Sequence, residues 1–403
     1  MKTCNIFLTI GIPEHRNAMY QRALFLSKEF DLHIYTFKGR DVAPRLRERA
    51  TIHLCPLDYS FLKRLKIYGH LIETLLFTLW IAANFMSKEN FFVYTFHMNG
   101  FSAAGLLKLI KGKSMIWVTD MQHTPYYYYD DSRRSEMPFL KKVVYGPIGL
   151  LYLVLGKLFL PRADTVVAMS FEYGEGFARI MAEDFKVKKE RLLPAPNGVD
   201  LANLERIAAG GRRSSIRIPD TKTKLLYAGN VRIERIGLLN DFLMKYRENC
   251  PDTSLIICGE MPADTLGVFE NIRDENLVHC GFIPHDELLM LYKEVDLVLA
   301  LIDGFMRDHN YSHPGKVYEA MAAGKVVAVN RLESVSRLVK DGYNGLIVDV
   351  DDLEKECGRI QEIISDPGER RRIEENAVKS VEFLDWKNIH PKWFARIREL
   401  VTK

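Results

Sequence analysis

The feature that most limits the fold of this chain is an alternation of short, wholly apolar runs with longer helix-like stretches. Segments 18–29 and 103–111 have helical character and separate runs rich in β-branched and aromatic residues. Runs that are apolar throughout are typical of parallel strands covered on both faces. The alternation therefore predicts an α/β fold with a doubly wound sheet. The predicted strands are 5–10, 32–37, 91–96, 114–118 and 165–169.

The same alternation starts again after a polar, glycine-containing stretch at 208–223. A chain of 403 residues is longer than one ordinary hydrophobic core supports. We expect two Rossmann-like doubly wound domains, 1–196 and 197–383, that face each other across a cleft, because open α/β sheets bind ligands at their strand ends. A C-terminal helix, 384–403, is predicted to pack back on the first domain. The second set of predicted strands is 224–228, 254–258, 277–279, 297–301 and 326–329.

Charge and cysteine content narrow the class of protein only in part. The formal net charge of +4 is small for this length and argues neither for nor against a nucleic-acid partner; none is expected. The six cysteines are scattered and form no Cys-x-x-Cys pair, so a metal cluster or a disulfide scaffold is not expected. Reduced thiols in a cytoplasmic protein are the simpler interpretation. The apolar run at 6–10 is shorter than a signal-peptide core and is predicted to be a strand.

Two segments without charge, 74–87 and 143–156, raise the question of a membrane. A spanning helix needs about 20 residues, so neither segment is expected to cross a bilayer. Basic residues flank both, among them Lys142 and Lys157. Two interpretations stay open: core helices with solvated ends, or peripheral attachment to an anionic membrane surface on the cytoplasmic side.

A strand that ends in Gly229-Asn230 and is followed by Arg232 and Arg235 has the properties of a phosphate site. Glycine allows a ligand to approach the backbone closely, and an arginine can bind two phosphate oxygens at once. The alternative is an ordinary surface loop with solvated arginines.

A second candidate anion site begins at Pro314-Gly315, where a loop opens a helix. Unpaired amides and the positive end of the helix dipole favour an anion there, and Lys316 adds a point charge. Glu319 lies on the same helical face as Lys316 and is suited to bind ribose hydroxyls. The alternative is a Lys–Glu pair on a capped surface helix.

On the N-terminal side, His123 and Asp120 lie near the end of a predicted strand, where the crevice of an α/β sheet is expected. A lone histidine is more often structural than catalytic, so its placement is what raises interest. The aromatic run 125–129 is a candidate acceptor rim or an ordinary packed loop. The loop 11–17 follows the first strand and is expected to face the same crevice.

Taken in order, these segments resemble the family-four glycosyltransferases of the GT-B fold, and the resemblance covers nearly the whole chain. Asn197-Gly198-Val199-Asp200 is similar to the hinge of that family, and Lys316 to Gly324 is similar to its donor-binding helix. Further similar segments are Ala163-Asp164 with Ser170, Gly229 to Gly237, Cys280 to Pro284, and Asp341 to Leu346.

The resemblance implies a retaining, metal-independent glycosyltransferase without a cofactor. It would transfer a hexose-type sugar from a UDP- or GDP-sugar to a glycan or lipid-linked acceptor in surface polysaccharide or glycolipid synthesis. Its implied catalytic residues are His123, Arg235 and Lys316. The implied donor-binding residues are Gly229, Asn230, Arg232, Phe282, Ile283, Tyr311, Pro314, Gly315, Val317 and Glu319. The implied acceptor-side residues are Gly11, Arg16, Asn17, Asp120 and Tyr126.

The chain departs from the family pattern at two positions. Tyr311 stands where the family has the first of two glutamates, and Asn230 stands where an arginine is usual, with Arg232 close by to compensate. Asp349-Val350-Asp351 looks like a metal motif, but it falls in a turn of the resembling pattern and is rejected as one. Two rival functions stay open: a sugar-nucleotide epimerase or hydrolase of the same fold, and a non-catalytic sugar-nucleotide-binding partner.

Overall fold

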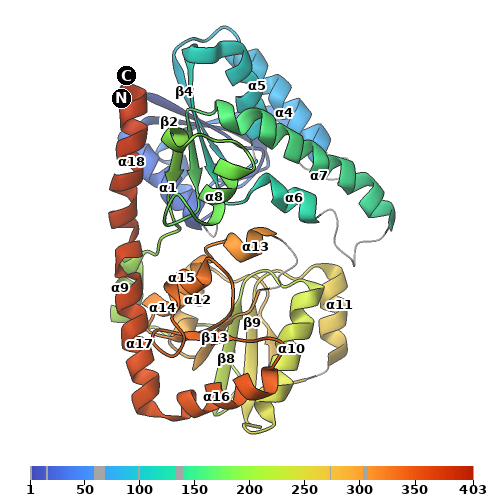
Figure 1. The fold of residues 1–403 in the computed structure, drawn as a ribbon, viewed down its shortest axis with the longest axis vertical. Coiled ribbons are helices and arrows are strands. Elements are labelled where there is room, and N and C mark those ends of the chain that lie inside the picture. Colours follow the sequence, from blue (N-terminus) through green and yellow to red (C-terminus); the bar gives the residue numbers. More distant parts are fainter. Residues whose placement is uncertain are drawn as a thin grey trace. The chain divides into compact units, whose positions relative to one another are not determined.

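The computed structural model describes residues 2–14, 17–58, 69–98, 100–131, 139–272, 274–302 and 307–402. The chain folds into two compact units (Figure 1). Unit 1 comprises 1–196 with 305–312 and 389–403, and unit 2 comprises 197–304 and 313–388. Residues 307–312, expected in the second domain from the sequence, therefore belong to unit 1 although both flanking segments belong to unit 2.

The sheet of unit 1 is wholly parallel, with strand order β3-β2-β1-β4-β5-β6-β7. Its order reverses between β1 and β4, which is the kind of switch point at which open α/β sheets form ligand crevices. The strands are β1 (Thr3–Phe7), β2 (Asp31–Lys38), β3 (Ala50–Asp58), β4 (Phe91–Phe96), β5 (Met115–Met121), β6 (Thr165–Ala168) and β7 (Leu192–Pro194).

Helices cover both faces of this sheet and bury an apolar core on each side. One core contains Phe77, Phe101 and Phe159 from one helical layer, and the other contains Met19 and Trp393 from the opposite layer. The first layer has α4 (Gly69–Phe85), α5 (Phe101–Lys111), α7 (Phe139–Phe159) and α8 (Gly176–Glu183), with the short α6 (Pro125–Asp131) beside α7. The second has α1 (Asn17–Glu29), α2 (Pro44–Arg47) and α18 (Trp386–Thr402).

The two uncharged segments of the sequence lie in α4 and α7. Among the described residues, no helix combines the length and the hydropathy that crossing a membrane requires. Both helices bury one side in the core of unit 1, through Phe77 and Ile81 on α4 and Phe159 on α7.

The sheet of unit 2 is also wholly parallel, with order β10-β9-β8-β11-β12-β13. The strands are β8 (Thr223–Ala228), β9 (Thr253–Cys258), β10 (Leu277–His279), β11 (Leu297–Ala300), β12 (Val326–Asn330) and β13 (Leu346–Val348). The helices are α9 (Leu201–Ala209), α10 (Ile233–Arg247), α11 (Ala263–Ile272), α12 (His285–Tyr292), α14 (Gly315–Ala322), α15 (Val335–Leu338), α16 (Leu353–Ser365) and α17 (Pro367–Val381).

Two parallel Rossmann-like sheets confirm the predicted α/β fold class. The segment that crosses into unit 1 carries α13 (Arg307–Tyr311). Trp393 and Ile397 of α18 are buried in unit 1, so the last turns of the chain complete the first core.

Candidate functional site

The carboxyl ends of β8, β9 and β10 form a glycine-lined edge in unit 2. Gly229 and Gly259 have φ values of 134° and 146°, which side chains rarely tolerate. The amide of Gly229 donates to the carbonyl oxygen of Cys258 (2.8 Å), and the amide of Gly259 donates to that of Gly281 (2.8 Å). A Cβ atom on Gly259 would lie 2.0 Å from the carbonyl oxygen of Gly229. Only backbone therefore fits at this edge of the sheet.

Two cations converge on Tyr227 at the end of β8. The ammonium Nζ of Lys316 lies 4.1 Å from the centroid of the Tyr227 ring. Nη1 of Arg235 donates to the Tyr227 hydroxyl (2.9 Å) and to the carbonyl oxygen of Asn230 (3.0 Å). A Cβ atom on Gly229 would lie 3.1 Å from Lys316 Nζ, so the ammonium also borders the glycine turn.

The tyrosine reports the electrostatics of this place. Tyr227 is fully buried, and burial alone raises the pKa of a phenol; yet the charges of Lys316 and Arg235 bring the pKa of Tyr227 below its usual value. The potential at the phenol oxygen is therefore positive enough to outweigh desolvation. The same potential favours any anion that binds beside these two cations.

Helix α14 presents its amino end next to Lys316. Its first turn is closed by a hydrogen bond from the Val317 amide to the carbonyl oxygen of Pro314 (3.0 Å). The preceding residue, His313, is buried, and its carbonyl oxygen accepts from Nδ2 of Asn197 (2.9 Å) in the hinge. Burial lowers the pKa of His313 to about 3, so this imidazole is neutral near pH 7. It therefore shapes the start of α14 without adding charge.

Glu319 lies one turn further along α14, and it is almost buried. Its Oε1 is 2.9 Å from Nε2 of His285, at the start of α12. Burial alone lowers the pKa of His285, but the hydrogen bond and charge of Glu319 outweigh it, so that this pKa is raised. The pair keeps the Glu319 carboxylate in a fixed orientation. Its contact with ribose hydroxyls of the donor stays a prediction.

Four further donor-side residues lie on the same edge of the unit 2 sheet. Asn230 is exposed after Gly229, and Arg232 immediately precedes α10. Phe282 is 53% exposed and Ile283 is nearly buried, both just beyond β10. An exposed aromatic ring at the carboxyl edge of a sheet is suited to stack on a flat ligand group.

In unit 1, His123 lies between β5 and α6 with 41% of its side chain exposed. Its ring packs against Tyr127 (centroids 4.4 Å apart) and His97 (5.3 Å). Its Nδ1 atom is buried and faces Oδ2 of Asp308, 3.6 Å away. His123 is thus held on one edge and open on the other.

Asp120, predicted on the acceptor side, is 1% exposed. Its Oδ2 forms an ion pair with Nη1 of Arg22, which is equally buried, and accepts a hydrogen bond from the Tyr94 hydroxyl (2.8 Å). This placement gives the carboxylate a structural role inside unit 1.

The other acceptor-side predictions are placed as follows. Gly11 has no room for a side chain, because a Cβ atom would lie 1.9 Å from the carbonyl oxygen of Asp41. Tyr126 is partly buried, with the guanidinium of Arg307 4.4 Å from its ring centroid. Asn17 begins α1, and Arg16 lies outside the described residues.

Tyr311, which replaces the family's glutamate, belongs to unit 1 together with the rest of α13. Its ring packs against the apolar core of that unit, and the guanidinium of Arg179 lies 5.3 Å from the ring centroid. In the rejected metal motif, Oδ1 of Asp349 accepts from the Asp351 amide (3.1 Å), which makes the motif a turn.

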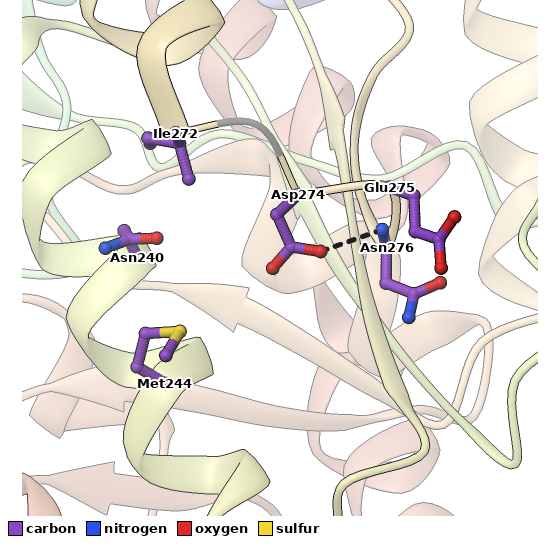
Figure 2. A pocket seen from close by; sticks show the side chains of 6 residues that line it. All are labelled: Asn240, Met244, Ile272, Asp274, Glu275 and Asn276. Carbon is purple, nitrogen blue, oxygen red and sulfur yellow. Dashed lines mark hydrogen bonds between the residues drawn. The ribbon is translucent and has the colours of Figure 1, made fainter.

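Two surface hollows of about 660 Å³ each lie elsewhere on unit 2. Figure 2 shows the first, between Asn240 and Met244 of α10 and the segment Asp274 to Asn276 that leads into β10. The second includes Lys224, near the start of β8. Both adjoin the amino ends of strands, opposite the edge where parallel sheets bind ligands. Neither is lined by a predicted site residue.

Three residues that contact the candidate site residues have no role predicted from the sequence: Tyr227 and His285 in unit 2, and Asp308 in unit 1. Tyr227 could have been noticed as a polar ring near the end of a buried strand, two residues before Gly229. For His285, the only sequence feature that indicates a role is its place at a helix start. For Asp308 no sequence feature indicates a role, because its hydrogen-bond partner Thr124 lies 184 positions away in sequence.

Residues 212–380 match the family model described as glycosyl transferases group 1. No curated protein sequence matches the chain. Among solved structures, sucrose-phosphate synthase from Thermosynechococcus elongatus is similar over the full length of both chains, with a TM-score of 0.68 and 16% identity. HepE from Anabaena, in complex with UDP and glucose, is similar over both full chains at 0.65 and 13%.

The glycosyltransferase WaaG, involved in lipopolysaccharide biosynthesis, covers 98% of each chain with a TM-score of 0.61 and 13% identity. At such identities these likenesses establish the fold. The segment that matches the family model contains Gly229, Arg235, Lys316 and Glu319. The chain therefore has the two-sheet GT-B fold, and its residues 212–380 are similar to the group 1 glycosyltransferases.

Proposed function

We propose that this enzyme transfers a hexose-type sugar from a nucleotide sugar, with UDP as the favoured nucleotide, to a glycan or lipid-linked acceptor, with retention of the anomeric configuration. The observation that carries the proposal is the convergence of Lys316 and Arg235 on Tyr227, beside a glycine edge and a helix start. The preference for UDP comes from HepE, whose complexes contain UDP, glucose and UDP-glucose.

The residues support this chemistry because the bond between the sugar and the diphosphate breaks with negative charge building on the leaving group. Fixed positive charge against a leaving group lowers the barrier, and Lys316, Arg235 and the amino end of α14 would supply it. The acceptor oxygen would bond to the anomeric carbon while its proton passes to the departing phosphate. We propose that His123 meets the donor sugar or the reacting centre from unit 1.

Phe282 and Ile283 are proposed to bind the nucleobase, and Glu319 to bind hydroxyl groups of the donor. The proposed acceptor side includes Tyr126 and the loop after β1. We further propose that the enzyme works at the cytoplasmic face of a membrane, in the synthesis of a surface polysaccharide or glycolipid.

Adding UDP is expected to raise the melting temperature of the protein without any divalent metal. A ligand at 100 times its dissociation constant stabilises the folded state by about 2.7 kcal/mol. GDP and ADP at the same concentration serve as matched controls. Transfer from the corresponding sugar nucleotide is then followed by NMR of the product, which reports its anomeric configuration.

Loss of transfer on adding a chelator would contradict the metal-independent mechanism. Free sugar formed without any acceptor would favour a hydrolase. Binding of a nucleotide sugar with neither transfer nor hydrolysis across an acceptor panel would favour the non-catalytic partner.

A further inference from the structure

Three helices of unit 1, α4, α5 and α7, are apolar on their outer as well as their inner sides. The inner side chains enter the core, as Phe77, Phe101 and Phe159 show. A surface helix of a globular protein normally carries polar residues on its outer side. Here the outer side instead carries large apolar side chains that are 38% to 78% exposed: Leu75 and Leu79; Leu106, Leu109 and Ile110; Phe139, Val143, Leu150, Val154 and Leu158.

These helices form one continuous layer. Helix α5 packs against both α4 and α7, and Figure 1 shows the three along one flank of the sheet of unit 1. The hydroxyls of Thr74 and Tyr152 lie 3.2 Å apart, which joins α4 to α7. A Cβ atom on Gly105 would lie 2.3 Å from the ring of Phe159, so α5 and α7 are in close contact. The exposed apolar residues named above are therefore carried by one packed layer of helices, and together they are called the α4–α5–α7 face.

The charges carried by these three helices are mostly positive. Glu73 is the only acidic residue in them, and it is buried in an ion pair with Arg40 (2.6 Å). The helices contain five lysines, 108, 111, 141, 142 and 157, of which Lys108 is paired with Asp164 (2.6 Å). Lys157, Lys113 and Arg162 are exposed near the end of the layer where α5 meets α7. An apolar surface bordered by positive charge is complementary to anionic lipid headgroups over acyl chains.

We propose that the α4–α5–α7 face docks on a bilayer that contains anionic phospholipid. A second copy of the chain fits less well, because a symmetric contact through this face would bring its positive border against itself. So many exposed large apolar side chains on one packed helical layer are unusual on a protein that stays in water. The proposed function enters this inference at one point: it gives the reason for docking, which is access to a lipid-linked acceptor.

The test is sedimentation of the full chain with vesicles of phosphatidylcholine alone, or with about 30% phosphatidylglycerol added to supply a negative surface potential. We expect cosedimentation with the anionic vesicles only. The variant Leu75→Glu/Leu79→Glu/Leu150→Glu is expected to reduce the bound fraction about tenfold or more, because buried apolar area drives binding. The matched control Met244→Glu/Val268→Glu alters exposed apolar residues of unit 2 and should bind as before.

Equal binding of the triple variant, or binding to neither kind of vesicle, would overturn the proposal. So would a dimer in solution that the triple substitution converts to monomer. Soluble transfer by the triple variant to a short-chain acceptor would leave the proposed function standing even if docking failed.

A second, independent observation concerns Asp308 on α13, whose side chain is fully buried. Its Oδ2 accepts from the amide of Thr124 (2.7 Å) and its Oδ1 accepts from the Thr124 hydroxyl (2.5 Å). The same Oδ2 lies 3.6 Å from Nδ1 of His123, beyond hydrogen-bond length but within reach of its charge. One carboxylate therefore fixes the turn that carries the candidate catalytic histidine.

The surroundings of His123 define which edge of its ring is usable. Nδ1 is buried and has no hydrogen-bond partner among the described residues, while 41% of the side chain is exposed. The groups that face the ring are Asp308, His97 and Tyr127. A carboxylate beside Nδ1 favours the tautomer with its proton on Nδ1, which leaves the lone pair of Nε2 on the open edge.

We infer that Asp308 is a positioning residue that holds His123 in this tautomer and orientation; the inference rests on the proposed function. Asp308→Asn keeps the shape, and its carbonyl oxygen stays in the place of Oδ2 because the Thr124 amide donates there. The substitution removes the negative charge beside Nδ1, which weakens the preference for a proton on that atom. We expect kcat to fall about tenfold or more while KM for the donor stays unchanged. The orientation and tautomer of His123 should affect mainly the reaction step and not donor binding. The ¹⁵N spectrum of labelled histidine, with His123→Ala for assignment, should show the change of tautomer.

The matched control is Asp130→Asn, since Asp130 also holds α13, by accepting from the Arg307 amide (3.1 Å). It should retain kcat and the His123 signal. Unchanged kcat and tautomer in folded Asp308→Asn, or an equal loss in Asp130→Asn, would overturn the inference. Absence of transfer in the unaltered enzyme would count against the proposed function instead, and the tautomer measurement would still decide the role of Asp308.

Discussion

Replacing Arg235 by alanine and Lys316 by methionine together is expected to lower kcat for sugar transfer by about a thousandfold or more. Removal of one preorganised charge-stabilising donor typically costs about a hundredfold to a thousandfold in kcat. Both side chains contact Tyr227, so their effects should be less than additive. Arg235→Lys should also be impaired, because an ammonium cannot reproduce the planar two-bond contact of a guanidinium. Initial rates with saturating donor and acceptor measure this effect.

The matched control is Arg206→Ala, which removes an exposed cation of unit 2 that pairs with Asp286 (2.7 Å). It should leave kcat as it is. Melting temperatures distinguish lost catalysis from lost folding, since Arg235 is buried and Lys316→Met preserves the length of the side chain. A folded double variant with full turnover would refute the proposed neutralisation of the leaving group.

Asp120→Ala is expected to destabilise unit 1 by about 3 to 5 kcal/mol, because it leaves the buried charge of Arg22 without its counterion. Burial alone lowers the pKa of Arg22, but Asp120 and Tyr94 raise it above its usual value, so the guanidinium stays charged when the pair is intact. For a unit of this size the midpoint of thermal unfolding should fall by about 10 °C. Calorimetry of the whole chain, with the two transitions compared, measures it.

The double variant Arg22→Met/Asp120→Leu should recover much of the loss, since apolar side chains of similar volume can replace a buried ion pair. Asp41→Ala is the control for removal of an acidic side chain at an exposed position, where the pair with Arg47 (3.7 Å) is weak. An Asp120→Ala protein as stable as the unaltered chain would show that the carboxylate makes no net contribution to the core.

The fold class could be predicted because buried parallel strands leave an unmistakable pattern of wholly apolar runs. Strand β3 was not predicted because it lacks such a run. It is an edge strand with several exposed positions, so polar and apolar residues are mixed along it. Strands β7 and β13 have three residues each, too few for any period to show.

The loops that carry the candidate site could be predicted, because α/β sheets bind ligands where their strands end. The way the side chains of the candidate site converge could not be predicted. Tyr227, Arg235 and Lys316 come from three different elements, β8, α10 and α14, and sequence places each element without giving the directions of its side chains. Asp308 was still harder to predict. Its carboxylate binds the turn at Thr124, which lies between β5 and α6 and is far from Asp308 in sequence.

The two uncharged segments show the limit of hydropathy. Core packing and membrane contact were alternatives in the sequence, yet α4 has one side in the core and another side exposed, as Phe77 and Leu79 illustrate. Average hydropathy of a helix cannot separate these sides when both are apolar.

The burial of Trp393 and Ile397 in unit 1 has a consequence for biosynthesis. A ribosome makes the protein from its amino end, and domains commonly fold in that order as they emerge. Here the first unit lacks part of its core until α18 has left the exit tunnel. Unit 2 is thus able to finish folding first, and the nascent amino-terminal half must stay free of aggregation until α18 emerges.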